Sequence, residues 1–340
     1  RHGRLLGMKE PFLFKLVDMV VHENESAYPD LREKQDYITK LIRVEEENFG
    51  RTIDGGLRIF ADTMAGCKEK NVTVFPGDAA FLLHDTYGFP LDLTLDMAEE
   101  EGMTVDEDRF RERMEEQRKM AVANWKKIVE IAVNMGVPVI NTEFSGDPNQ
   151  QEICNGMWFR SMEELLPIIE REGLRVEIQS HPYDFCELND ETCDLVKSFR
   201  SPNLGYVYSA SHGFFYDQGK GDVRHMLKYA GDELTHVLFA DTWNQTKDCR
   251  YILNPPWLNQ RGRADVTIHQ HTAMGEGEVD FEGIFETLRE MDFANKQLKP
   301  DAPKVGGDNI ACVSYFGFPE KMDKQAPEAR EIIERELLGR

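Results

Sequence analysis

The feature that most constrains this chain is an alternation of short apolar runs and amphipathic segments after residue 136. The apolar runs have the length of buried strands, and they predict strands at 137–144, 174–179, 204–210, 234–240 and 310–316. The amphipathic segments predict helices at 161–171, 190–198, 222–230, 281–291 and 326–338. Strands separated by helices are typical of parallel β/α units. The sequence therefore predicts an α/β region with about five parallel strands.

The first 120 residues have a different pattern, which indicates helices around an acidic turn. Residues 38–60 place apolar side chains on one face and Glu and Arg on the other, which predicts an amphipathic helix. Asp78 can cap a short helix, and the turn Tyr87-Gly88-Phe89-Pro90 should end it. We therefore expect an all-α domain at 1–120.

A long helix should connect the two patterns. An apolar stripe runs without a break through residues 110–135, and Gly136 supplies a stop. The chain is therefore expected to divide into the helical domain, 1–120, and a β/α domain, 120–340. The seam is expected at 117–124, inside this helix.

Composition narrows the class of protein. No window approaches the ~18 consecutive apolar residues of a membrane helix, and no basic-then-apolar leader is present. These absences predict a cytoplasmic protein without a membrane contact, and the start on Arg1 suggests a processed end or a cut fragment. The net charge of −22 repels phosphate backbones, so RNA binding would need a local basic patch. The 6 cysteines contain no C-x-x-C pair and are expected to be buried thiols.

Potential metal ligands follow several predicted strands. Glu143 closes the first strand, Glu177 lies in the second, His212 follows the third and Asp241 follows the fourth. An uncertain excursion before the fifth strand ends in His271. In β/α barrels the C-terminal strand ends form the active-site face, and imidazoles with carboxylates there suit divalent transition metals. The alternative is that each histidine is a hydrogen-bonded structural residue and that Glu143 is a solvated loop carboxylate.

Four segments of the first 120 residues resemble alanyl-tRNA synthetase: RHGRLLG, PFLFKLVDMVV, EEENFGRTIDGGL and HDTYGFPLDLT. They correspond to the helical region that follows the aminoacylation core. The resemblance implies that Asp85, in the D-x-x-G-x-P turn, contacts the tRNA acceptor stem, and a carboxylate can accept a hydrogen bond from a base amino group. The alternative is that Asp85 only terminates a helix. The catalytic core and the editing signature of that family are absent, so alanine activation is not expected.

Residues 120–340 resemble the xylose isomerase-like TIM barrels, the sugar phosphate isomerase/epimerase superfamily, and among them those of inositol catabolism. The likeness rests on NMGVPVINTEFSG, RVEIQSHPYDF, GYVYSASH, HVLFADTWN, RYILNPP and HQHTAMGEGEVDF. A full barrel of this kind has eight strands, so the first strands are missing and a partial barrel is expected. Its open strand edges could support a homo-oligomer.

This second resemblance implies a divalent metal, Mn, Co, Zn or Mg, held in the family by Glu, Asp, His and Glu. Ser209 and Leu238 stand where the Asp and the His are expected. The altered metal set that we expect is Glu177, His212, Asp241 and His271, with His181, His236 and His269 as alternatives.

Three functions remain open on the sequence. The first is a metal-dependent isomerase, epimerase or related lyase acting on a sugar phosphate or an inositol-derived polyol or ketone. Glu143 or Glu177 would then move the proton on the carbon beside the carbonyl. The second is a synthetase fragment that binds a tRNA acceptor stem through Asp85. The third is a composite chain, inactive because its barrel is incomplete.

Overall fold

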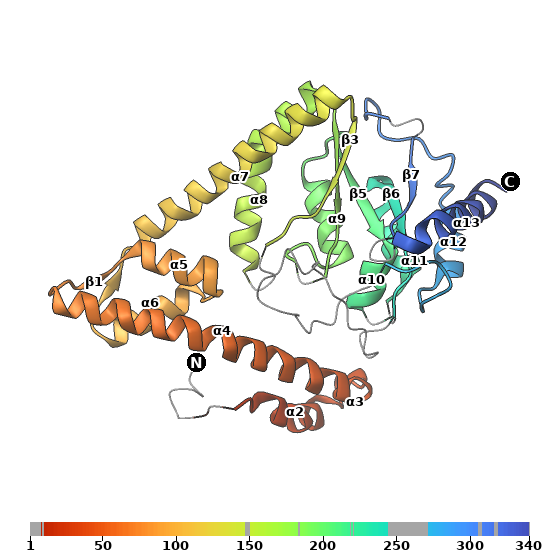
Figure 1. Cartoon of the computed structure of the whole chain (residues 1–340). Coiled ribbons are helices and arrows are strands. Elements are labelled where there is room, and N and C mark those ends of the chain that lie inside the picture. Colours follow the sequence, from red (N-terminus) through yellow and green to blue (C-terminus); the bar gives the residue numbers. More distant parts are fainter. Residues whose placement is uncertain are drawn as a thin grey trace. The chain divides into compact units, whose positions relative to one another are not determined.

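A computed structural model describes residues 8, 10–146, 150–182, 184–217, 219, 221–243, 271–304, 308–315 and 319–339 (Figure 1). The chain divides into two compact units, a first unit at Arg1–Arg118 and a second unit at Lys119–Arg340. No helix in the described ranges combines the length and the apolar character needed to cross a bilayer.

The first unit consists almost entirely of helices. They are η1 (Leu13–Leu16), α2 (Val17–Asn24), α3 (Asp30–Glu33), α4 (Gln35–Glu69), α5 (Gly77–Tyr87), α6 (Leu91–Glu100) and the beginning of α7 (Glu107–Met135). Two short strands, β1 (Val74–Phe75) and β2 (Thr104–Val105), pair in parallel. Gly88 ends α5 in the left-handed conformation, with φ of 55°, as the turn sequence predicts.

The second unit is a parallel sheet of five strands among its described residues, which confirms the predicted class. The strands are β3 (Val139–Thr142), β4 (Arg175–Gln179), β5 (Leu204–Ser209), β6 (Leu234–Phe239) and β7 (Ile310–Val313). They lie side by side in chain order, with β3 and β7 at the two ends of the sheet. The sheet is therefore a partial barrel, preceded by a helical unit.

Helices follow the strands of the second unit. They are α8 (Gln151–Arg171), α9 (Asn189–Ser198), α10 (Ala210–Tyr216), α11 (Val223–Ala230), η2 (Gly231–Glu233), α12 (Phe281–Glu290) and α13 (Pro319–Leu338). The predicted strand 204–210 stops at Ser209, because Ala210 begins the short helix α10. His212 therefore lies in the first turn of that helix.

The two faces of the sheet differ because side chains alternate along each strand. Val176 and Ile178 of β4 pack with Trp158 and Ile169 of α8 in one apolar cluster. Tyr206 and Phe239 belong to a second cluster that α9, α11, α12 and α13 complete. On β4, the side chains that alternate with Val176 and Ile178 lie on the other face of the sheet: Arg175, Glu177 and Gln179. This polar face carries the groups described below.

Candidate metal centre

Three histidines come together at the C-terminal ends of the strands. His181 follows β4, His212 follows β5, and His271 precedes α12. The ring centroids of His181 and His212 are 4.8 Å apart, and those of His212 and His271 are 5.1 Å apart. The structure thus brings together two of the predicted ligands, His212 and His271, with one of the alternatives, His181.

Hydrogen bonds to carbonyl groups orient two of these rings. The Nδ1 atom of His212 lies 2.8 Å from the carbonyl oxygen of Ser180, and Nδ1 of His271 lies 2.8 Å from that of Ser314. A carbonyl oxygen can only accept, so both Nδ1 atoms carry a hydrogen. In a neutral ring Nε2 then presents a lone pair. This is the arrangement by which histidines that bind metals are usually fixed.

The two Nε2 atoms face each other at 3.1 Å. The hydroxyl of Ser211 lies 3.2 Å from Nε2 of His271 and can donate to it. Burial lowers the pKa of His271 to about 4, against the bond to Ser314, so this ring is neutral at pH 7. Two nitrogen ligands that each lie about 2.1 Å from one ion are roughly 3.0 Å apart at a right angle and roughly 3.4 Å apart at the tetrahedral angle. The pair therefore has the spacing and the tautomers of two ligands of one cation.

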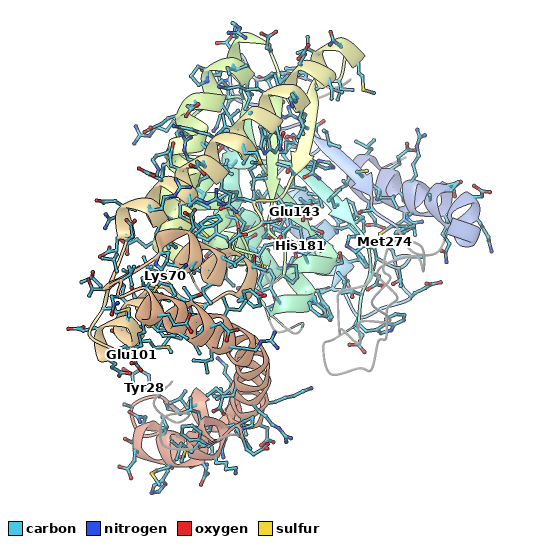
Figure 2. The ribbon with its side chains drawn as sticks, turned by 60° about the vertical axis from the view of Figure 1, so that its left-hand side comes forward. Tyr28, Lys70, Glu101, Glu143, His181 and Met274 are labelled. Carbon is cyan, nitrogen blue, oxygen red and sulfur yellow. The ribbon has the colours of Figure 1, made fainter. Side chains whose placement is uncertain are left out.

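Next to this pair lies a second group of potential ligands. Glu143, His181 and Asp184 offer ligand atoms that all lie within 4.8 Å of one another, and Figure 2 labels Glu143 and His181. Burial alone would lower the pKa of His181, but its hydrogen bond to the Asp184 carboxylate and the charge of Glu143 raise it. The side-chain amide of Gln179 donates to Glu143. A group of two carboxylates and one imidazole suits a divalent ion.

Asp184 is the member of this group that the sequence did not predict. It stands three residues after His181, and its carboxylate oxygen lies 3.2 Å from Nδ1 of that ring. The signal was present in the HPYD segment, which brings a second potential ligand back toward the first in a turn after β4.

Glu177 lies deeper in the sheet, in the middle of β4. Its Oε1 accepts from Arg175 at 2.9 Å and from Thr235 at 2.8 Å, and its Oε2 lies 2.8 Å from Nδ1 of His236. Burial alone would raise the pKa of Glu177, but His236 and Arg175 hold it below its ordinary value. Its roles as a metal ligand and as a catalytic base stay predictions.

Asp241 holds the loop that precedes α12. Its Oδ2 accepts from the backbone N–H groups of Gly275 and Gly277, both at 2.8 Å. Its Oδ1 accepts from the N–H groups of Thr242 and Val279, at 2.9 and 3.0 Å. Four donors thus share this carboxylate, and its role as a ligand also stays a prediction. His269 lies outside the described residues.

In the first unit, Asp85 is exposed in the last turn of α5. The side-chain amide of Gln117 donates to its Oδ1 at 2.6 Å. The carboxylate is therefore accessible at the surface, and a contact with RNA stays a prediction.

A parallel partial barrel with imidazoles and carboxylates at the C-terminal strand ends defines a β/α-barrel protein with a candidate metal centre. Residues 78–303 match the family of xylose isomerase-like TIM barrels, and the chain belongs to that family. Residues 1–147 match the family of class II (A) tRNA synthetases, which confirms the composite resemblance.

Curated relatives match part of the chain. The alanine–tRNA ligase of Clostridioides difficile is 50% identical over 121 residues, which are 36% of this chain and 14% of that protein. The alanine–tRNA ligase of Acetivibrio thermocellus is 49% identical over 121 residues, again 36% and 14% of the two chains. The chain thus spans 14% of the length of these relatives.

Solved structures resemble the chain more distantly. A xylose isomerase domain protein from Planctomyces limnophilus has 18% identity and a TM-score of 0.46, over 66% of this chain and 70% of that one. The IOLI protein with a bound zinc atom has 16% identity and a TM-score of 0.44, also over 66% and 70%.

Proposed function

We propose that the second unit binds one divalent ion at His212 and His271, and uses it to isomerise or epimerise a sugar phosphate or an inositol-derived polyol or ketone. The observation that supports this most is the 3.1 Å approach of the two Nε2 atoms, with both Nδ1 atoms bonded to carbonyl oxygens. Among Mn, Co, Zn and Mg, imidazole ligands favour the first three. The substrate class is the one that the resemblance to sugar phosphate isomerases and epimerases implies, and the match to the xylose isomerase-like TIM barrels supports it.

The neighbouring group of Glu143, His181 and Asp184 would supply the proton transfers. A bound divalent ion polarises a carbonyl and acidifies a hydroxyl. Glu143, oriented by Gln179, would remove the proton from the carbon beside the carbonyl and return it. His181, with its pKa raised beside Asp184, would donate a hydrogen bond to the substrate oxygen. Glu177, enclosed by its bonds within the sheet, would keep that face in place.

Metal binding can be tested by thermal unfolding of the chelator-treated chain with and without Mn²⁺, Co²⁺ or Zn²⁺. A ligand of the folded state alone adds about 2.7 kcal/mol at a hundredfold excess over its dissociation constant. We expect an upward shift of the midpoint in the wild type and its loss in His212→Ala and His271→Ala. His225→Ala is the matched control, because that exposed imidazole pairs with Asp190 on the outer helices. Equal shifts in all four proteins would exclude the site.

The reaction can be tested by proton exchange in D₂O. Ketohexoses, ketohexose phosphates and inososes are incubated with the metal-loaded chain, and NMR follows the proton on the carbon beside the carbonyl. Glu143→Gln should abolish exchange and keep the metal-dependent shift, because it removes the base and keeps a side-chain oxygen. Metal binding without exchange on any of these compounds would reject the isomerase. A broad thermal unfolding transition whose midpoint does not change with metal would favour the third function, an inactive composite chain.

A second candidate is binding of a tRNA acceptor stem by the first unit. It is favoured by the 50% identity to an alanine–tRNA ligase over 121 residues. An RNA hairpin with the acceptor-stem sequence should bind at low salt, and Asp85→Asn should weaken it more than Asp92→Asn, an exposed control on α6. Background binding at low salt, or equal loss in the two variants, would remove this candidate.

A further inference from the structure

Two strands of the sheet have a neighbour on one side only among the described residues: β3 and β7. All residues of the central strands β5 and β6 are buried, whereas the four residues of β7 are half-buried or exposed. Ala311 and Cys312 are the exposed ones, so the thiol of Cys312 is an exception to the prediction that the cysteines are buried. The N–H and C=O groups along an open edge of a sheet are a template for another strand.

Beside this edge lies a groove of about 540 Å³ between β7 and α13, which Figure 1 labels at the same end of the sheet. The floor of the groove is apolar, since Phe293 and Ile333 are 2% and 7% exposed. On its rim, the large apolar side chain of Leu338 is 46% exposed. The open edge and the groove therefore form one continuous surface, which can accept both the backbone and the side chains of a partner.

The side of α13 that lines this groove is a single stripe. Its residues recur at spacings of three and four: Ala326, Arg330, Ile333, Glu334, Leu337 and Leu338. Arg330 and Glu334 pair with each other at 2.8 Å, and their side chains are 77% and 39% exposed. A second chain can therefore reach both charges.

This stripe is complementary to itself. In an antiparallel pair of α13 helices centred on Ile332, the small Ala326 of one helix faces the large Leu338 of the other. In the same pair, Arg330 of each helix faces Glu334 of the other, so opposite charges meet twice. An interface in which residue i meets j and j meets i is isologous, which is the type found in two-fold dimers.

We propose that the occupant of this surface is a second copy of the chain, in a dimer whose two-fold axis passes between the two β7 strands and between the two α13 helices. The β7 strands lie antiparallel and continue the sheet from one chain into the other. The α13 helices cover the joint, and Leu338 of each chain packs on Ala326 of the other. A homo-oligomer through an open edge thus uses β7, because the groove adjoins that edge. The dimer does not depend on the proposed metal centre.

The first test measures the mass of the wild-type full-length chain by analytical ultracentrifugation over a series of concentrations. EDTA is present, so that pairs bridged by a metal do not form. We expect a species of twice the chain mass of 39.2 kDa that increases with concentration. A chain that stays monomeric would overturn the proposal and leave the groove to a different protein. Species that grow beyond a dimer would also overturn it, because they indicate head-to-tail contact of β7 with β3.

The second test exchanges charges on α13. Arg330→Glu brings two carboxylates together across the axis, and Glu334→Arg brings two guanidinium groups together. Each change should raise the dissociation constant of its own dimer by about tenfold or more. An equal mixture of the two variants should dimerise as the wild type does, because opposite charges then meet at both contacts. Single variants that dimerise normally, or a mixture that does not recover, would overturn the proposal.

The third test separates the two open edges. Ala311→Lys places a charge at an exposed position of β7 and should weaken the dimer by about tenfold or more. Asn141→Lys, the same change at the exposed position of β3, should leave the dissociation constant unchanged. Circular dichroism checks that both variants are folded. Equal dissociation constants for the two folded variants would show that β7 is not the interface.

Discussion

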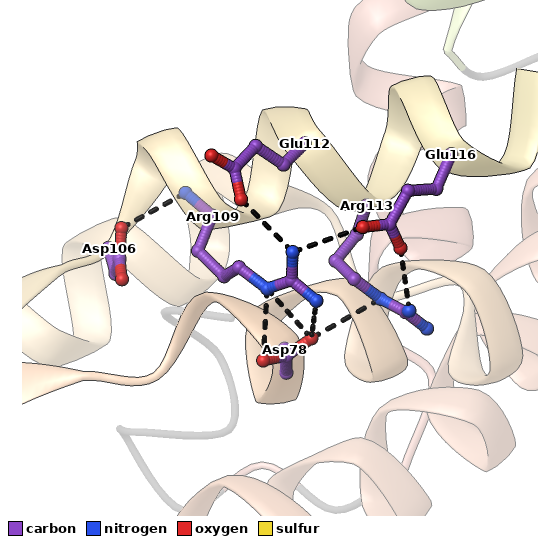
Figure 3. A network of polar contacts seen from close by, with 6 residues as sticks. All are labelled: Asp78, Asp106, Arg109, Glu112, Arg113 and Glu116. Carbon is purple, nitrogen blue, oxygen red and sulfur yellow. Dashed lines mark hydrogen bonds and ion pairs between the residues drawn. The ribbon is translucent and has the colours of Figure 1, made fainter.

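Two networks of charged side chains in this chain use the same chemistry in opposite surroundings. In the first unit, Asp78 on α5 pairs with Arg109 at 3.0 Å and with Arg113 at 3.3 Å (Figure 3). Arg109 reaches Glu112 and Glu116 as well. The Asp78 and Arg109 side chains are 59% and 33% exposed, so water can replace either partner.

In the second unit, the pair of Arg175 and Glu177 is 0% exposed on both sides. Removing one partner there leaves the other charge buried without compensation, which costs far more than losing a surface pair. The exposed network therefore fastens two helices weakly. The buried network holds the polar face of the sheet, where the candidate sites lie.

The largest effect is expected for Arg175→Met. It leaves the Glu177 carboxylate buried with only His236 and Thr235 as partners, and should cost about 3–5 kcal/mol of unfolding free energy. Urea unfolding of the second unit measures this loss. Adding Glu177→Leu should recover much of the loss, because no charge is then stranded. If Arg175→Met lost as little unfolding free energy as Asp78→Asn, a substitution in the exposed network, the contrast between the two networks would be wrong.

The next effect concerns pH and His271. Its pKa is lowered by burial from 6.5 to about 4, so between these values the unfolded state binds a proton and the folded state does not. Stability should therefore be full above about pH 6.5 and fall as the pH drops toward 4, by roughly 3 kcal/mol. Urea unfolding of the metal-free chain across this range measures the slope. The dependence of the unfolding free energy on pH should become weaker in His271→Gln and stay the same in His225→Gln.

A smaller effect is expected for Gly205→Ala. The added Cβ would lie 2.3 Å from Oγ1 of Thr235 and push that side chain away from Glu177. We expect this overpacking to cost about 1–3 kcal/mol of unfolding free energy. Gly156→Ala in α8 is the control, because a Cβ there meets nothing within 4 Å and the helix favours alanine. Thermal unfolding compares the two. Equal midpoints would show that the buried network tolerates displacement.

The smallest effect is expected for Asp78→Asn. The carboxylate stands in water, where solvent replaces the lost ion pairs and the Arg side chains stay hydrated. The unfolding midpoint of the first unit should change little, and added salt should erase the remaining difference. A loss that persists in high salt would mean that this network acts as a buried one does.

Local patterns predicted most of the fold. The runs predicted at 174–179 and 234–240 became β4 and β6 with nearly the predicted bounds, because the residues of each strand that face the covering helices are apolar. The helix predicted at 161–171 begins ten residues earlier, at Gln151, because its first turns carry buried residues such as Cys154 and Trp158 at helical spacing. The predicted helix at 38–60 is part of the longer α4.

The sequence by itself placed His212 and Asp241 after neighbouring strands of one parallel sheet, because parallel strands end on the same edge. It kept His181 only as an alternative ligand and put His271 at the end of an uncertain excursion. Only the tertiary structure decided what each group contacts. Glu177 bonds with Thr235 and His236, two strands away, and Gly205 on the intervening strand leaves the space that the Thr235 side chain occupies. Asp241 binds the backbone of a loop more than thirty residues later. Such contacts depend on strand register and loop path, which local periodicity does not encode.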